Sequence, residues 1–310
     1  MDYVHDYSKT YAGLPVARFF GEDDALPEPG EVAWRLGTSE WDEGPYAIGE
    51  LLDRFFASVD TERVTALVIG AWEDCTDDDS SHLVERLVAE AARLPALRSL
   101  FFGAVVVEEA EISWIQQSDV TPLLKAYPRL ERFDVRGGAG LALSPVRHEA
   151  LRMLRFETGG LPSAVVRAVA ASDLPALEHL ELWLGVSEYG GDATVADLAA
   201  ILSGEHLPAL RHLGLQDSEI QDEIAAAVAS APVVARLGSL ALSMGVLRDA
   251  GAEALLSGQP LTHLRKLDLH HHFMTEAMTT RLAAALPGVE LDLSGSEWSE
   301  RGWTYVAVSE

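Results

Sequence analysis

The sequence predicts an α/β fold, a right-handed solenoid in which short parallel strands form one concave sheet and helices line the convex side. Three observations predict it. A six-residue apolar phrase returns along most of the 310 residues, stretches with helical spacing lie between its copies, and a proline commonly precedes the phrase. With 48% hydrophobic residues, a chain of this length can bury a sizeable interior.

The repeated phrase is Leu-x-x-Leu-x-Leu, with other apolar residues replacing leucine in some copies. Its copies begin at Val64, Leu97, Leu130, Leu151, Leu177, Leu210, Leu237 and Leu264, and Leu291 with Leu293 supplies the end of a further copy. The alternation places the last two apolar side chains on one face of an extended segment and the residue between them on the other. Each copy is therefore predicted to be a strand that buries its leucines.

Helices are expected between the strands. Apolar residues recur at helical spacing over 82–94, 164–172, 195–203 and 276–286, after the potential N-cap residues Ser81, Ser163, Thr194 and Thr275. Pro95, Pro128, Pro175 and Pro208 stand two residues before a phrase, where proline ends a helix. A strand, a helix and the next parallel strand make a right-handed coil, and stacked coils bury the apolar faces that one repeat leaves exposed.

These phrases resemble leucine-rich repeats. Their long strand–helix form is similar to the ribonuclease-inhibitor-like subclass, which residues 246–269 match most closely. The resemblance covers about residues 60–295 and implies a horseshoe-shaped leucine-rich-repeat solenoid. The whole chain also resembles stand-alone bacterial leucine-rich-repeat proteins, a resemblance that implies no known activity.

The sequence departs from the family pattern at one position of the repeat. The family usually has Asn or Cys three residues after the last strand leucine, and this chain contains no Asn. The corresponding positions hold Trp72, Val105, Gly138, Gly159, Gly185, Ser218, Gly245 and His272. The glycines indicate that turns of the backbone replace a ladder of buried side chains.

Three parts of the chain are predicted. Residues 1–60 form an N-terminal capping segment, with a strand at 32–36 and an amphipathic helix at 47–59. Residues 61–295 form the solenoid of about eight to nine repeats, and 296–310 form a C-terminal cap. In that cap, residues 303–310 are expected to add a final strand, and Trp298 and Trp303 to seal the end of the solenoid.

Charge and composition exclude several classes of function. The 49 acidic and 23 basic residues give a net charge of −26 without a basic stripe, which argues against nucleic acid and anionic membranes as ligands. No apolar run is long enough to span a bilayer, and the first residues lack the pattern of a secretory signal, so we expect a cytoplasmic protein. The acidic surface serves either solubility or a basic partner.

The single cysteine, Cys75, excludes an intramolecular disulfide and a multi-cysteine metal site. Asp77, Asp78 and Asp79 follow it closely, and their charge is expected to raise the pKa of the thiol and make it a poor nucleophile. No nucleophile elbow, phosphate loop or dinucleotide fingerprint is present. We therefore predict no catalytic residue, no cofactor and no metal.

The residues that should face outward from the concave sheet are the candidate partner-binding site. They are His179, Glu181, Trp183, His212, Gln216, Asp268 and His270. An exposed Trp183 beside acids and imidazoles would resemble the anchor of an interface, because Trp and Arg dominate binding hot spots. The leading hypothesis is a non-catalytic scaffold or adaptor that binds another protein on this face.

Two alternatives remain open. The chain could be an accessory subunit or inhibitor-like regulator of an enzyme. A more remote alternative is a metal-dependent enzyme centred on Asp268, His270 and His272, since alternate residues of an extended chain share one face. The sequence does not fix the oligomeric state or the identity of the partner.

Overall fold

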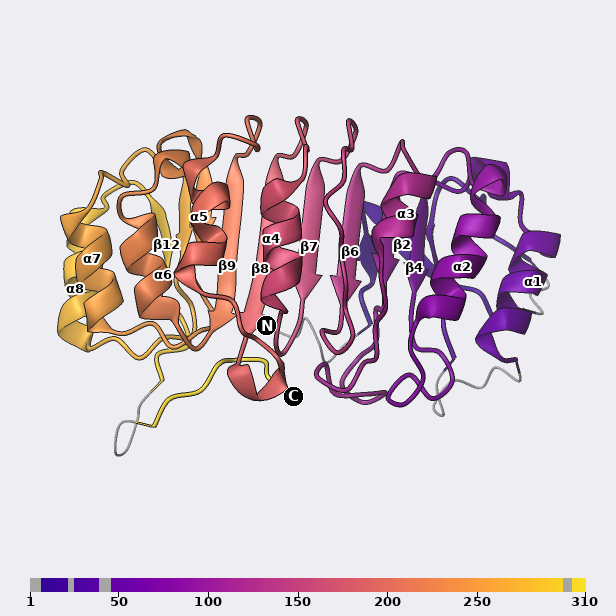
Figure 1. Ribbon diagram of the computed structural model, residues 1–310, viewed down its shortest axis with the longest axis horizontal. Helices are drawn as coiled ribbons and strands as arrows, with labels where there is room; N and C mark the ends of the chain where they lie inside the picture. Colours follow the sequence, from indigo (N-terminus) through magenta and orange to yellow (C-terminus); the bar gives the residue numbers. More distant parts are fainter. Residues whose placement is uncertain (1–6, 22–24, 39–45, 298–302) are drawn as a thin grey trace.

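The computed structural model describes residues 7–21, 25–38, 46–297 and 303–310, and in these ranges one twelve-stranded sheet runs in chain order from β1 to β12 (Figure 1). Strands β1 and β2 pair antiparallel, and every later pairing is parallel. The strands are β1 (Thr10–Tyr11), β2 (Leu14–Arg18), β3 (Ala33–Leu36), β4 (Ala66–Ile69), β5 (Ser99–Phe102), β6 (Arg132–Arg136), β7 (Met153–Glu157), β8 (His179–Gly185), β9 (His212–Ser218), β10 (Ser239–Ala241), β11 (Lys266–Asp268) and β12 (Glu290–Asp292).

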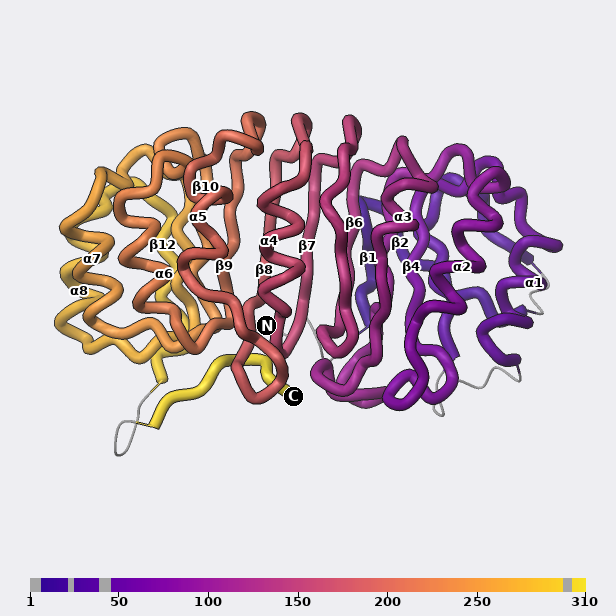
Figure 2. The backbone as a smooth tube through the Cα atoms, viewed as in Figure 1, coloured from indigo at the N-terminus to yellow at the C-terminus, as the bar shows by residue number. Residues whose placement is uncertain are grey.

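The helices lie together on one face of this sheet, in front of the strands as Figure 1 is drawn, and the tube in Figure 2 shows the repeated coils. They are α1 (Ile48–Ser58), α2 (Ser81–Ala89), α3 (Thr121–Ala126), α4 (Ser163–Ala171), α5 (Val195–Ser203), α6 (Gln221–Val228), α7 (Asp249–Ser257) and α8 (Glu276–Ala285). Short 3-10 helices lie at Thr61–Arg63, Ala91–Arg93, Ser187–Tyr189 and Pro232–Arg236. No helix in the described ranges is both long and apolar enough to cross a bilayer. The predicted α/β solenoid is confirmed.

The register of the sheet follows the repeated phrase. Leu180, Leu213, Leu240, Leu267 and Leu291 lie side by side in five successive strands, from β8 to β12. The first four are fully buried. A buried leucine is worth about 1.5–3 kcal/mol relative to an exposed one, so each repeat depends on its neighbours for most of its stability. The predicted alternation of buried and outward-facing residues is confirmed.

Close backbone contacts and individual buried polar side chains stand where the family has its asparagine. At Gly185 φ is +68°, and a Cβ atom there would lie 1.9 Å from the carbonyl oxygen of Gly159 in the preceding coil, so only glycine fits. At the equivalent place in β11's repeat, the buried His272 ring contacts the Leu293 carbonyl at 3.1 Å and accepts a hydrogen bond from the Met274 N–H. Different repeats therefore use different residues at this turn: a glycine in one and a hydrogen-bonded histidine in another.

Helix N-termini are capped both locally and from neighbouring repeats. Thr194 and Thr275 cap α5 and α8 as predicted. The predictions for Ser81 and Ser163 were wrong, because each residue is already the first of its helix. Between repeats, Asp192 accepts from the Ser163 N–H, Asp222 from Arg248 and Gly251, and Asp249 from Thr275. These aspartates join adjacent coils and place negative charge at the positive ends of helices.

The N-terminal segment extends the sheet and covers part of its open face, the face that carries no helices. The strand and helix predicted there are β3 and α1, and β3 pairs with β4. Tyr11 packs on the open face against Phe101, with ring centroids 5.9 Å apart, and its hydroxyl donates to the Asp134 carboxylate at 2.8 Å. The guanidinium of Arg132 lies 4.7 Å from the Tyr11 ring centroid. The open face over β3 to β6 is thus occupied by the chain itself.

The C-terminal segment does not form the expected strand. Residues 303–310 are irregular and cross beneath the lower ends of the strands, back toward β8 (Figure 2). The Ala307 N–H donates to the Met244 carbonyl and the Val308 N–H to Asp217, both at the ends of neighbouring strands. Trp303 is 75% exposed and seals nothing, while Trp298 lies outside the described residues. The division into two caps and a solenoid stays a prediction.

Asp217 should make the stability of this arrangement depend on pH. Its side chain is fully buried, and burial raises the pKa of its carboxyl well above the ordinary value of 3.8. The folded protein therefore holds this proton more tightly than the unfolded chain. The contribution to stability is present at acidic pH and is lost as the pH rises from about 4 through the folded pKa.

Replacing Asp217 with Asn removes this titration, and Asn tolerates the positive φ of 55° at this position. We expect the melting temperature of Asp217→Asn to exceed that of the wild type at pH 8, with a smaller difference at pH 4.5. Thermal melts monitored by circular dichroism at both pH values check this. A difference independent of pH would contradict the assignment of the raised pKa.

Candidate functional site

The open face of the sheet carries rows of side chains that run across the strands in register. One row is Arg132, Met153, His179, His212, Ser239, Lys266 and Glu290, and the next is Asp134, Arg155, Glu181, Gly214, Ala241, Asp268 and Asp292. They alternate with the buried leucines, as a strand requires. Function is expected here, because the other face is covered by helices.

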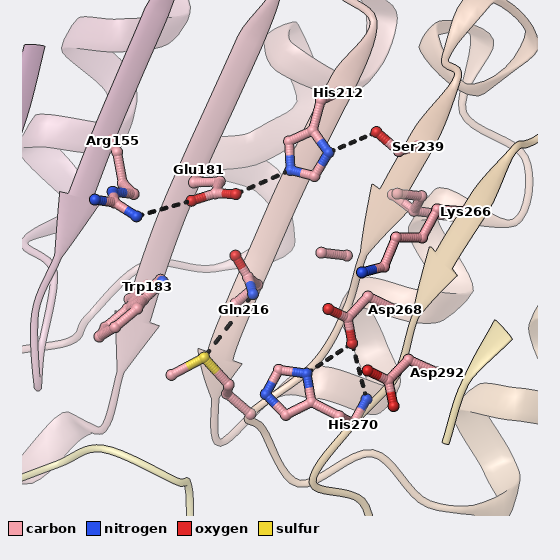
Figure 3. Close-up of a pocket in the computed structure, with 13 residues that line it drawn as sticks. Arg155, Glu181, Trp183, His212, Gln216, Ser239, Lys266, Asp268, His270 and Asp292 are labelled. Atoms are coloured by element: carbon pink, nitrogen blue, oxygen red, sulfur yellow. Dashed lines mark hydrogen bonds and ion pairs between the residues drawn. The ribbon is translucent and has the colours of Figure 1, made fainter. Parts of the chain in front are cut away.

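A cavity of about 220 Å³ lies in the open face over β8 to β12. Ala241, which stands between Gly214 and Asp268 in the second row, is small and leaves the space above it unfilled. Above Gly214 the space is already taken, because a Cβ there would lie 2.7 Å from Gln216 Oε1 and 2.9 Å from Glu181 Cγ. The lining residues are Arg155, Glu181, Trp183, His212, Gln216, Ser239, Leu240, Ala241, Met244, Lys266, Asp268, His270 and Asp292 (Figure 3).

The structure brings six of the seven residues expected at the binding face into this one cavity: Glu181, Trp183, His212, Gln216, Asp268 and His270. The seventh, His179, lies beside it and contacts Glu181. One expectation was wrong, since Trp183 is only 2% exposed and is part of the wall rather than a projecting anchor. Whether these residues bind a partner remains a prediction.

Carboxylates and guanidinium groups alternate on the β6–β8 side of the cavity. Arg155 Nε lies 2.8 Å from Asp134 and 3.1 Å from Glu157, and its Nη1 atom lies 3.8 Å from Glu181. Arg136 donates to Glu157 at 2.8 Å. Asp134 and Glu157 are fully buried, so these cations are needed to offset their desolvation. The network fixes the position of Arg155 and, through it, of Glu181.

Two histidines converge on the carboxylate of Glu181. Its Oε1 atom lies 2.9 Å from His179 Nε2 and 3.2 Å from His212 Nε2. The two imidazole rings stack, with centroids 3.9 Å apart. His212 Nδ1 lies 2.7 Å from Ser239 Oγ (Figure 3). Burial alone would raise the pKa of Glu181, but hydrogen bonds from the histidines and the charge of Arg155 outweigh it, so this pKa lies well below its usual range. Glu181 is therefore ionised at neutral pH.

The opposite side of the cavity carries a second cluster. Asp268 Oδ1 lies 2.6 Å from His270 Nδ1, and Asp292 from β12 completes the group (Figure 3). His272, expected on the same face as His270, is directed into the core instead. The reason is the intervening His271, whose φ of 54° turns the chain and ends the alternation. The group of Asp268, His270 and His272 does not form.

Among the described residues, two buried polar atoms of the cavity wall have neither a hydrogen-bond partner nor an ion-pair partner: the indole nitrogen Nε1 of Trp183 and the amide oxygen Oε1 of Gln216. Trp183 is 2% and Gln216 6% exposed. An unpaired buried donor or acceptor costs about 1–3 kcal/mol, so a ligand that supplies a matching acceptor or donor gains affinity. The cavity wall therefore offers one unpaired donor and one unpaired acceptor to a polar group.

Cys75 is a structural residue. Its side chain is buried, and burial together with the charges of Glu109 and Asp74 raises its pKa to about 11. The direction agrees with the prediction, but burial is the main cause, and the carboxylates of Asp77 to Asp79 do not contribute among the main causes. At neutral pH the thiol is protonated and a poor nucleophile.

Seven residues of the cavity are not among the predicted partner-binding residues: Arg155, Ser239, Leu240, Ala241, Met244, Lys266 and Asp292. Asp292 carries a signal that could have found it, because it stands between Leu291 and Leu293 as Asp268 stands between Leu267 and Leu269. Met244 lies after β10 with a φ of 69°, in a loop whose course no repeat pattern specifies.

The repeated strand–helix fold and the open face of its sheet identify the chain as a leucine-rich-repeat solenoid. A solved structure from Bacteroides fragilis, determined by a structural genomics consortium, is similar to it with a TM-score of 0.76 and 30% sequence identity, covering 80% of this chain and 71% of that one. At this identity and coverage the chain belongs to the same family as the Bacteroides fragilis protein.

A second solved structure, an internalin from Listeria monocytogenes, aligns with a TM-score of 0.38 and 14% identity over 88% of this chain and 62% of that one, a likeness too low to carry an argument. No family model and no curated protein matches the chain.

Proposed function

We propose that the chain is a non-catalytic, cytoplasmic protein-binding scaffold whose partner docks on the open face over β7 to β12 and inserts a polar side chain into the cavity. The observation that carries the proposal is the cavity itself, with the unpaired atoms of Trp183 and Gln216 in its wall. A polar wall that is incomplete in the free protein is completed when a partner group enters.

The position of the surface supports the proposal. The N-terminal segment covers the open face around Tyr11, while no segment among the described residues covers the cavity. Parallel strands present one side chain per repeat in each row, so a docked partner contacts several repeats at once. Shape and charge, spread over neighbouring strands, then give affinity and specificity.

Charge favours a basic group on the partner. Glu181, Asp268 and Asp292 contribute three carboxylates to the cavity, against the cations of Arg155 and Lys266, and the whole chain has a net charge of −26. Attraction of a basic partner would accelerate association and would weaken as salt is added. The strand–helix form of the repeats is consistent with the ribonuclease-inhibitor-like subclass. If the partner is an enzyme, the chain would act as its accessory subunit or inhibitor.

Filling the cavity tests the proposal. Ala241→Leu adds bulk on the open face without changing the leucine interior, and Ala199→Leu adds the same bulk on an exposed position of α5. We expect a protein captured by the wild type and by Ala199→Leu to bind Ala241→Leu at least tenfold more weakly once it has been purified and titrated. Equal binding by all three would contradict docking at the cavity.

A further inference from the structure

Three side chains at the edge of the cavity converge in the pattern of a metal site. His179 and Glu181 stand two residues apart on β8, and His212 is paired with His179 on β9. Their ligand atoms all lie within 4.8 Å of one another. They combine two imidazoles and one carboxylate, the donor set that suits zinc and other divalent transition ions.

We propose that His179, Glu181 and His212 bind one divalent transition metal ion of the zinc type. Tetrahedral coordination with bonds of about 2.1 Å separates the ligand atoms by about 3.4 Å. The distances from Glu181 Oε1 to the two Nε2 atoms, 2.9 and 3.2 Å, are close to that separation. The two rings are stacked with only 14° between their planes, so each must rotate about its side-chain bonds for both Nε2 lone pairs to point at one ion.

The surroundings supply the support that metal ligands need. Ser239 Oγ contacts Nδ1 of His212, the ring nitrogen that does not face the carboxylate. Arg155 is held by Asp134 and Glu157 and lies beside the other oxygen of Glu181, which orients the carboxylate.

The protein provides three ligands, and at least one further coordination position is free for another group. Glu181 and His212 line the cavity, so that position faces the space where a water molecule or a polar group of a partner fits. The inference goes beyond the proposed scaffold, because metal binding requires no partner protein.

The second cluster, Asp268, His270 and Asp292, is a weaker candidate. Asp268 Oδ1 already bonds the imidazole and the N–H of His270, and Asp292 Oδ1 accepts from the N–H and the hydroxyl of Ser294. These local bonds occupy the atoms that an ion would need. The cluster supplies a control for the experiment.

Titration of the purified, untagged protein with Zn²⁺ in a calorimeter tests the proposal, with Co²⁺ absorption as a second readout of coordination. We expect one equivalent of Zn²⁺ to bind the wild type and visible Co²⁺ bands typical of a nitrogen- and oxygen-bound ion. His212→Gln and Glu181→Gln should each weaken Zn²⁺ binding by about 100-fold, and Ser239→Ala by about tenfold.

Asp292→Asn, in the second cluster, should bind Zn²⁺ as the wild type does. His179→Gln is a further variant at the more exposed ligand, which keeps the test informative if Glu181→Gln fails to fold. No binding by the wild type, binding that survives in the folded ligand variants, or loss of binding in Asp292→Asn would overturn the assignment. Since no partner is present, failure of this test leaves the scaffold proposal standing, and failure of the cavity-filling test leaves the metal site standing.

Discussion

Leu213→Asp is expected to unfold β9 together with the strands on either side. Leu213 is fully buried and lies between Leu180 and Leu240 in the row that crosses the interior. Truncating a buried leucine to alanine costs about 2–5 kcal/mol, and the aspartate adds a charge with no partner in this apolar interior. Because each repeat is stabilised by its neighbours, the damage extends to β8 and β10.

Urea unfolding followed by far-ultraviolet circular dichroism measures the effect. A matched control is Ala226→Asp, which introduces the same residue on the exposed side of α6 in the same repeat. We expect the control to unfold near the wild-type midpoint and Leu213→Asp to have lost most of its cooperative transition. A wild-type midpoint for Leu213→Asp would show that the interior is not continuous at this row.

Arg155→Met should have the second-largest effect. The substitution keeps much of the volume of the side chain but leaves Asp134, Glu157 and Glu181 without the cation they share. Removing one partner from a buried ion pair costs about 3–5 kcal/mol, because the remaining charge is left desolvated. Arg132 still pairs with Asp134 and Arg136 with Glu157, so we expect a cost near the lower end of this range.

The control for this variant is Arg152→Met, which removes an arginine directly before β7. Arg152 pairs with Glu178 at 2.5 Å, but both side chains are more than half exposed, and such pairs are worth about 0–1 kcal/mol. Chemical denaturation of both variants at pH 7 checks the prediction. Equal stabilities of the two variants at pH 7 would contradict a structural role for the shared cation.

The sheet was predictable because its cause is local and repeated. Each phrase specifies a strand through the alternation of its own residues, and the common position of Leu213 and Leu240 in successive phrases specifies how the strands align. The choice of His179, Glu181 and His212 as outward-facing residues follows from the same alternation. None of this requires knowledge of the loops.

The rest depends on contacts between residues far apart in the chain. Capping of α4 comes from Asp192 in the next repeat, and no local pattern announces it. The course of residues 303–310 depends on single bonds such as that from Val308 to Asp217. The cavity lies over Ala241 and is lined from the neighbouring strands, so it becomes visible only when the exact pairing is known. The burial of Trp183 was not predictable for a similar reason: side chains from other strands cover this outward-facing residue.

The hollow between Glu181 and Asp268 lies over a small residue, Ala241, that takes no part in the leucine interior. A larger side chain at position 241 therefore reshapes the recess while the interior stays the same. Relatives that share the horseshoe can thus differ in what they admit through this one side chain, and a designer could alter the specificity of this surface with little cost to folding.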